Sequence, residues 1–190
     1  MTLLKEPGDL PKTHAAFSDQ YDARAPQTKP EPVAYIEQTR NRYDGLGYPP
    51  YQWFEAEDIA VLAPISKPLS ESRLGLISSA GTYVTGQTAF FYKDDASIRE
   101  ISSKTGLADL RFSHIMENYL VEAWQDPGVL FPLEALQRLA QADVIGSLAD
   151  NFISCMGGIY SQRKVINELI PEIEVAVDRQ ALDLLLLVPL

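Results

Sequence analysis

Short apolar runs that end in small or polar residues recur along the chain, and they predict β-strands. The expected strands cover residues 59–63, 74–78, 110–114, 147–154 and 184–188. The last run reads Leu-Leu-Leu-Leu-Val and follows a single acidic residue, Asp183. Strands that are apolar on both faces belong to the middle of parallel sheets, where helices cover both sides. We therefore expect residues 184–188 at the centre of a sheet.

Apolar residues at helical spacing predict helices between these strands. A short helix begins near Pro32 and ends at Gly45 and Gly47, and a second begins at Phe131-Pro132, where proline suits the first turn. A long third helix follows residue 158, and Pro171 is expected to kink or split it. Strands that alternate with helices indicate an α/β fold. We expect one domain over residues 33–190, with a mainly parallel sheet flanked by helices.

Residues 1–32 differ from this domain because five prolines interrupt any helix and apolar residues are few. The composition predicts a flexible, partly disordered N-terminal arm. A second interpretation is that the arm clasps a partner subunit.

The charge of the chain limits its partners. Net charge is −10 and the sequence pI is about 4.6. Such a surface disfavours nucleic acid, whose binding needs Lys and Arg to displace phosphate counterions, and it disfavours anionic membrane surfaces. No stretch approaches the ~20 apolar residues that span a bilayer. We expect no nucleic-acid or membrane partner.

Cysteine usage bears on the compartment and on metals. The chain has one cysteine, Cys155, so it forms no internal disulfide, and its N-terminus lacks a secretory apolar core. These features favour a reducing cytoplasm. One cysteine and two histidines do not suit a structural zinc site, and we expect neither a metal nor a cofactor.

Two turns that follow predicted strands are candidate substrate-binding sites, because ligands of α/β sheets bind at the carboxyl ends of strands. The turn with Ser78, Ser79 and Gly81 offers hydroxyls and backbone donors, although serine and glycine are also ordinary turn residues. The Gly157-Gly158 turn precedes a helix whose positive end favours anions. Tight packing explains the two glycines equally well.

His114 and Cys155 are the candidate catalytic residues. His114 follows Ser113, a candidate substrate-binding residue, at an expected strand end, where an imidazole can exchange protons near neutral pH. Glu117 and Asn118 lie close enough in sequence to orient the imidazole or to contact a polar substrate. A structural histidine is the alternative. Cys155 stands where a helix dipole would favour a thiolate, but a small buried hydrophobic residue is the simpler interpretation.

Several segments, in order and with matching spacing over residues 33–190, resemble the selenoprotein B family of glycine, sarcosine, betaine and D-proline reductases. They cover residues 76–81, 109–114, 129–136, 144–150, 156–158 and 187–190. The resemblance implies reductive cleavage of a bond in a small amino-acid-like substrate, with a thioredoxin-like thiol donor to regenerate the enzyme.

The resemblance also concerns the attacking group. In this family, a selenocysteine or cysteine follows the Val-Pro pair of the last strand, which here is Val188-Pro189, and the sequence stops at Leu190. The family usually has an aromatic residue where Cys155 stands. We expect either a chain shortened at a UGA selenocysteine codon or a non-catalytic paralogue that serves as a binding or scaffold subunit, alone or in a homo-oligomer.

Overall fold

The computed structural model of the chain describes residues 34–50, 59–115 and 120–190. The chain divides into two units, Met1–Ala60 and Val61–Leu190. In the first unit, helix α2 (Tyr35–Gly45) confirms the predicted short helix, and Gly47 follows it in the left-handed conformation. None of the α2 side chains is buried. The predicted arm, residues 1–32, lies outside the described residues.

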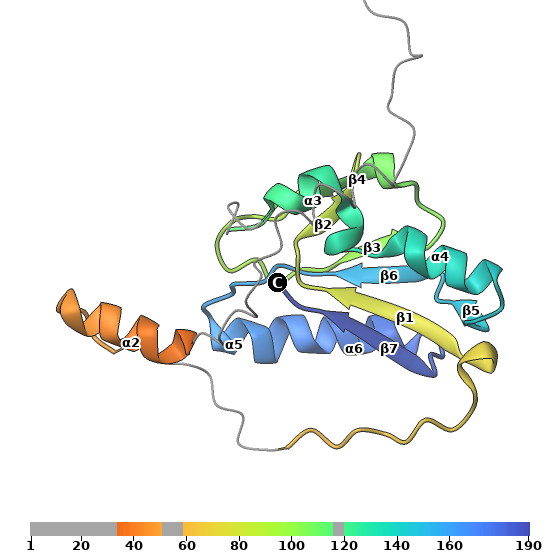
Figure 1. Ribbon diagram of the computed structural model, residues 1–190, viewed down its shortest axis with the longest axis horizontal. Coiled ribbons are helices and arrows are strands. Elements are labelled where there is room, and N and C mark those ends of the chain that lie inside the picture. Colours follow the sequence, from red (N-terminus) through yellow and green to blue (C-terminus); the bar gives the residue numbers. More distant parts are fainter. Residues whose placement is uncertain (1–33, 51–58, 116–119) are drawn as a thin grey trace, which may run out of the picture. The chain divides into compact units, whose positions relative to one another are not determined.

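The second unit is built on a five-stranded, mostly parallel sheet (Figure 1). Its central strand is β1 (Arg73–Ser78), which pairs in parallel with β5 (Ser147–Leu148) and β6 (Asn151–Ser154) on one side and with β7 (Leu184–Val188) on the other. Strand β3 (Arg99–Ser102) pairs antiparallel with β6 and closes that side of the sheet. The predicted α/β class with a mainly parallel sheet is confirmed.

A separate antiparallel ribbon joins β2 (Thr82–Val84) to β4 (Leu110–Phe112). The strand predicted at residues 110–114 is therefore real, but it pairs outside the main sheet and ends before Ser113. Its end still faces the turn that follows β1, because the Ser113 N–H donates to the Gly81 carbonyl at 2.9 Å.

Helices cover both faces of the sheet (Figure 1). One face packs against α4 (Leu133–Gln141). The shared core contains Leu76, Phe131 and Phe152, and the rings of the two phenylalanines meet edge to face. The other face packs against α6 (Ile170–Asp178) through a smaller cluster with Cys155 and Leu169 at its centre. The short helix α3 (Val121–Gln125) covers the β2–β4 ribbon through Phe112 and Trp124. No described helix has the length and apolar content that a bilayer crossing requires.

The long helix predicted after residue 158 is one continuous run of three parts. It begins as α5 (Gln162–Lys164), widens to a π-helix over Val165–Leu169, and continues as α6. The wide turn ends just before Pro171, whose ring lacks an N–H and would collide with a carbonyl of a regular preceding turn. The predicted break is thus a local widening, and the helix continues past it.

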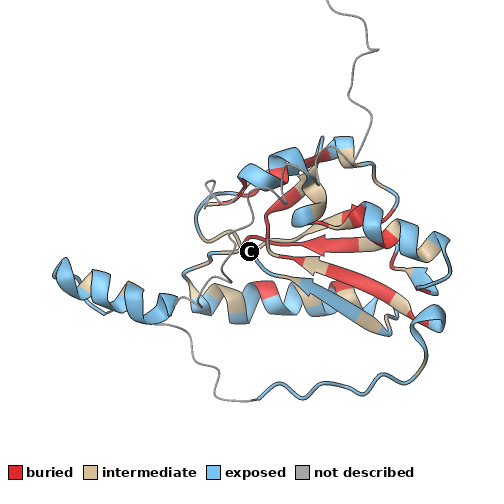
Figure 2. Cartoon of the chain, in the orientation of Figure 1, coloured by how far each residue is buried: buried red, intermediate tan, exposed pale blue. Residues whose placement is uncertain are grey.

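The place of β7 corrects one prediction. The strand has the expected bounds, but it lies at the edge of the sheet and pairs only with β1 among the described residues. Three of its five side chains are exposed, with Leu187 at 64% (Figure 2). The strand that is buried on both faces is β1. An uninterrupted apolar run marks contact on two faces, but it does not say whether a neighbour lies on each edge.

Two further predictions change in detail. Residues 59–63 form no strand, and Ile59, Val61 and Leu62 are almost fully exposed. The strand expected over residues 147–154 is two short strands, β5 and β6, separated at Ala149-Asp150. Pairing with different parts of β1 explains the interruption, since β5 meets its start and β6 its end.

Candidate functional site

The carboxyl ends of β1, β6 and β7 meet at one edge of the sheet, as parallel strands require. Beyond these ends, the Ser79 N–H donates to the Val188 carbonyl at 3.1 Å and the Gly81 N–H donates to the Cys155 carbonyl at 2.9 Å. Ala80 and Met156 form an isolated bridge between the same two turns. The two turns predicted to bind substrate are therefore neighbours, joined by backbone hydrogen bonds.

Gly157 lies where four chain segments converge. A Cβ atom at this position would lie 2.8 Å from Nε2 of His114, 2.8 Å from the Leu190 carbonyl oxygen and 2.9 Å from the Ser79 carbonyl oxygen. The Leu190 N–H also donates to the Ser79 hydroxyl at 3.0 Å. Only glycine lets these polar groups approach so closely, and the arrangement brings His114 to the end of the last strand.

His114 is buried, with 6% of its surface exposed. Burial lowers the pKa of the imidazole below its usual value, because desolvation penalises the cation. At neutral pH the ring is therefore uncharged and suited to accept a proton. Its predicted helper Asn118, like Glu117, lies outside the described residues.

The hydroxyls of the predicted substrate-binding serines are not equally available. The Ser78 hydroxyl is fully buried and donates to the Leu130 carbonyl at 2.9 Å, while the Ser113 hydroxyl donates to the Phe90 carbonyl at 3.0 Å. Both hold neighbouring segments in place. Ser79 is only partly buried, and its hydroxyl meets the Leu190 backbone.

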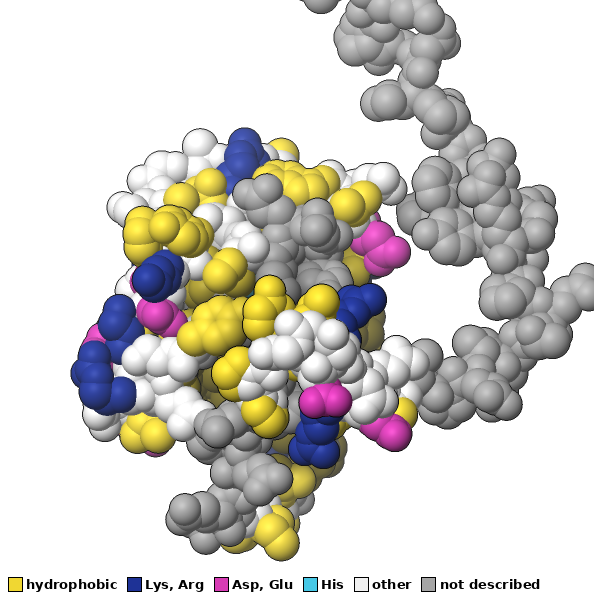
Figure 3. Space-filling model, turned by 90° about the vertical axis from the view of Figure 1, so that its left-hand side faces the viewer, with side chains coloured by type: hydrophobic (Ala, Val, Ile, Leu, Met, Phe, Trp, Pro, Cys, Tyr) yellow, Lys and Arg dark blue, Asp and Glu magenta, His cyan; other side chains and the backbone are white. Residues whose placement is uncertain are grey.

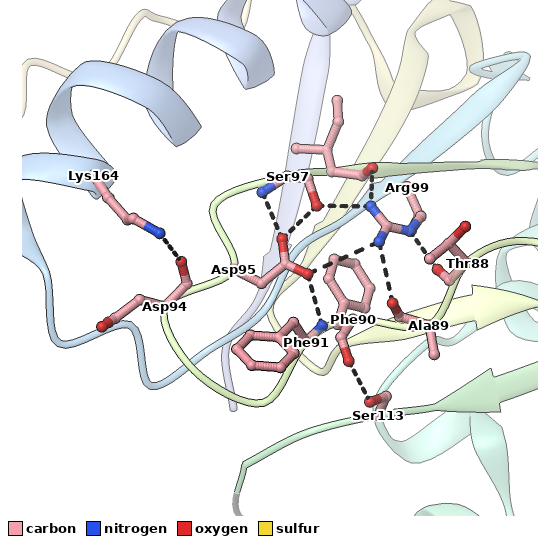
Figure 4. Close-up of polar contacts among 11 residues, drawn as sticks. Thr88, Ala89, Phe90, Phe91, Asp94, Asp95, Ser97, Arg99, Ser113 and Lys164 are labelled. Atoms are coloured by element: carbon pink, nitrogen blue, oxygen red, sulfur yellow. Dashed lines mark hydrogen bonds and ion pairs between the residues drawn. The ribbon is translucent and has the colours of Figure 1, made fainter.

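A carboxylate binds the backbone just before the long helix. Asp94 accepts hydrogen bonds from the backbone N–H groups of Tyr160 and Ser161 at 2.8 and 3.0 Å, and it has a left-handed backbone with φ of 50°. The Lys164 ammonium group donates to the Asp94 carbonyl at 2.8 Å (Figure 4). The backbone that leads into the helix thus binds an acidic side chain of the protein itself, and the Ser161 hydroxyl caps the helix by accepting from the Lys164 N–H at 3.4 Å.

The loop that carries Asp94 is ordered by its neighbour Asp95. The Asp95 carboxylate accepts from the Phe91 and Ser97 N–H groups and from the Ser97 hydroxyl, and it lies 3.9 Å from the Arg99 guanidinium (Figure 4). Burial acts to raise the pKa of Asp95, but these hydrogen bonds hold it below the ordinary value. Arg99 also stacks over the Phe90 ring at 4.3 Å.

The sequence pattern did not single out Asp94 or Asp95 for this role, because acidic residues in a polar stretch commonly form a solvated surface. The available signal was their place in a polar stretch after an aromatic patch, where aspartate often accepts backbone N–H groups. An open groove of about 470 Å³ runs between this loop and the helix, past Phe91, Lys164 and Glu172. None of the predicted site residues lines it.

Cys155 is 5% exposed, and its thiol donates to the Ser78 carbonyl at 3.8 Å. Burial raises the pKa of the thiol to about 11, so it stays protonated at neutral pH. These features favour the interpretation of Cys155 as a packing residue. No group of three or more His, Cys, Asp or Glu side chains suited to a metal occurs within residues 34–50, 59–115 and 120–190.

Figure 3 looks onto the end of the molecule that carries this edge. On the side turned to the viewer, hydrophobic side chains lie among Lys, Arg, Asp and Glu side chains. Exposed apolar residues from the contributing segments include Phe91, Tyr160 and Leu190. The segments around the site thus expose apolar side chains, although the net charge of the chain is −10.

Comparison with known proteins gives a relative with a described function. Over 128 residues the chain is 30% identical to D-proline reductase subunit gamma of Acetoanaerobium sticklandii. The chain is a distant relative of a reductase subunit. The match covers 67% of this chain and 52% of that subunit, so the chain spans about half the length of the curated relative. No family model matches the chain, and no solved structure does.

The relationship to reductases that the sequence predicted is therefore confirmed. Its assignment to the selenoprotein B family, a nucleophile beyond Leu190, the cytoplasmic location and the individual site residues stay predictions. In the structure, Ser79, Gly81, Ser113, His114 and Gly157 do come together at one edge, whereas the Cys155 thiol points into the core.

Proposed function

We propose that this chain forms the substrate-holding part of a thiol- or selenol-dependent reductase that cleaves a bond in a small amino-acid-like molecule. The observation that carries the proposal is the convergence of Ser79, His114, Gly157 and Leu190 at the carboxyl edge of the sheet, in a relative of a D-proline reductase subunit.

The proposed reaction needs two electrons and two protons. A thiolate or selenolate attacks the substrate carbon and displaces its amine, which leaves with one proton. A second thiol then attacks the sulfur or selenium atom, so the carbon departs with the bonding pair and takes up the other proton. A disulfide or selenenyl sulfide remains, and a thioredoxin-like dithiol reduces it by exchange.

In this proposal His114 moves the proton. Its neutral ring takes the proton from the attacking thiol or selenol and returns it to the leaving amine. The backbone around Gly157 and Gly158, together with Ser79, holds the carboxylate of the substrate. Gly81, Ser78 and Ser113 fix the positions of the two turns through the contacts described above.

The attacking group is proposed to lie beyond Leu190, because the Leu190 backbone reaches His114 and Gly157 while the Cys155 thiol is buried and protonated. Reading the gene beyond codon 190 tests this part. An in-frame UGA followed by a cysteine codon supports it, whereas UAA or UAG at that point refutes it.

The activity test uses the protein from its whole coding region, with D-proline and other small amino acids as substrates and a dithiol as reductant. We expect substrate-dependent oxidation of the dithiol. His114→Ala is expected to lower kcat by about a hundredfold, which is typical of a lost acid–base group. Glu134→Ala, an exposed change on α4, is the matched control and should leave kcat unchanged.

A failure to oxidise dithiol with every substrate would refute the catalytic proposal, and an unaltered kcat in His114→Ala would remove His114 from the mechanism. The alternative is a non-catalytic subunit, which is favoured by the single, buried thiol of the sequence. In that case the protein should fold, show no turnover alone, and restore turnover when a separate chain supplies the reactive thiol or selenol.

A further inference from the structure

The outer edge of β7 is a bare apolar surface. Ser79 donates to the Val188 carbonyl, and Val188 is paired with Ser78. In a parallel ladder with this register, every second residue of β7, including Val188, points its backbone N–H and C=O groups toward β1. The N–H and C=O groups of Leu185 and Leu187 therefore point outward, and they have no strand partner among the described residues.

An apolar segment of the same unit is equally bare. Residues 61–65 read Val-Leu-Ala-Pro-Ile and form neither helix nor strand, and the side chains of Val61 and Leu62 are 96% and 87% exposed. The segment has the same length as β7 and carries no charge. Soluble proteins rarely leave two uncharged, strand-like surfaces open, because each invites pairing with another chain.

An ion pair holds the end of this segment at the start of β7. The Lys67 ammonium group lies 2.8 Å from the Asp183 carboxylate, which also accepts from the Arg73 N–H at 2.7 Å. Lys67 is two residues from Ile65, and Asp183 directly precedes Leu184. A chain that runs backward from Lys67 is therefore placed to follow β7 in the antiparallel direction.

We propose that residues 61–65 dock on the outer edge of β7 of the same chain as an antiparallel edge strand. Pro64 selects the register, because it has no N–H to donate and must point away from β7. Ala63 then pairs with Leu185, and Val61 with Leu187. In this register each of the open N–H and C=O groups of β7 finds a partner.

The docked strand has a consequence for the proposed site. Val61 would lie beside Leu187, at the end of β7 that leads to Leu190. Its side chain would cover the most exposed leucine of the strand and extend the apolar border of the edge that carries Ser79 and Gly157. The inference does not depend on the proposed reaction, since it rests on backbone pairing alone.

A cysteine pair tests the proposal. In the selected register, Leu62 and Leu186 form a non-hydrogen-bonded pair on one face, with Cα atoms about 4.5 Å apart, within disulfide reach. The variant Leu62→Cys/Leu186→Cys should form an intrachain disulfide under mild oxidation. Leu62→Cys/Leu187→Cys is the matched control, since its two side chains lie on opposite faces and should stay unlinked.

Each outcome decides the proposal. An intrachain 62–186 disulfide, with the control unlinked, supports it. A disulfide between chains would assign the β7 edge to a second copy and overturn it, as would the absence of any link or equal linking in both variants.

Hydrogen exchange on the unmodified protein guards against a misfolded variant. The amides of Val61, Ala63, Leu185 and Leu187 should exchange about tenfold or more slowly than free peptide amides, at a rate independent of protein concentration. Exchange at the free-peptide rate at Val61 and Ala63, or protection that appears only at high concentration, would refute docking within one chain.

Discussion

Replacing Gly81 by alanine should loosen the whole candidate site. Gly81 has φ of 65°, and an added Cβ would overlap the Ser113 carbonyl oxygen. Both backbones are held, because Gly81 donates to the Cys155 carbonyl and accepts from the Ser113 N–H. The overlap can be relieved only if Gly81 and the segment that carries Ser113 and His114 move apart.

The magnitude has two parts. A left-handed alanine costs roughly 1–2 kcal/mol, and relief of a steric overlap in a packed region adds about 1–3 kcal/mol. Gly86 separates them, since its φ is 97° and nothing lies within 4 Å of an added Cβ. Gly86→Ala should therefore cost only the backbone part, while Gly81→Ala should cost about 2–5 kcal/mol. That is a large share of the ~5–15 kcal/mol that stabilises a typical domain.

Urea unfolding followed by far-UV circular dichroism measures both free energies. Trp124 fluorescence gives a second, local signal, because its ring meets Phe112 at 6.1 Å on the ribbon that leads to His114. If Gly81→Ala loses no more stability than Gly86→Ala, the contact with Ser113 is not a constraint, and the geometry proposed for this edge is wrong.

Two further predictions concern titration. Burial raises the pKa of the Cys155 thiol to about 11, so its rate of reaction with a small disulfide reagent should keep rising with pH up to at least pH 10 in the folded protein. A rate that stops rising near pH 8 or 9 would contradict the burial of the thiol. The pKa of His114 is lowered in the folded protein, so the unfolded chain binds the proton first as pH falls below about 6.5. The free energy of unfolding should therefore decrease as the pH falls from that value to the lower pKa of the folded protein. The urea midpoint of His114→Gln should fall less steeply with pH than that of the unmodified protein. Equal slopes of urea midpoint against pH would mean that His114 is not buried.

Local sequence patterns predicted individual elements better than their neighbours in space. The bounds of β7 and the start of α4 followed from apolar spacing and from Pro132, because these signals act within a few residues. The position of β7 at the sheet edge did not follow, since its four leucines would suit a central strand as well. Residues 59–63 show the converse, because a strand-like pattern needs a partner before it becomes a strand.

The candidate site was predicted in outline from the same rule of strand ends. Ser79, His114 and Gly157 were expected near one edge and lie there, whereas Asp94 was missed. Its role depends on Tyr160 and Ser161, which are more than sixty residues away in the sequence. Contacts over such distances are set by the fold, and the local signal at Asp94 marks it as an acceptor of backbone N–H groups without identifying which residues donate them.

The hydrogen bonds of Asp94 limit how this architecture can be taken apart. The loop after β2 supplies the carboxylate, and the two residues just before the long helix, Tyr160 and Ser161, supply the N–H groups that bind it. Neither segment would keep its conformation if it were grafted alone onto another scaffold, since the loop would lose its anchor and the residues that lead into the helix would lose the carboxylate that holds them. For protein engineering, the loop and the helix start form a single module and should be transplanted together.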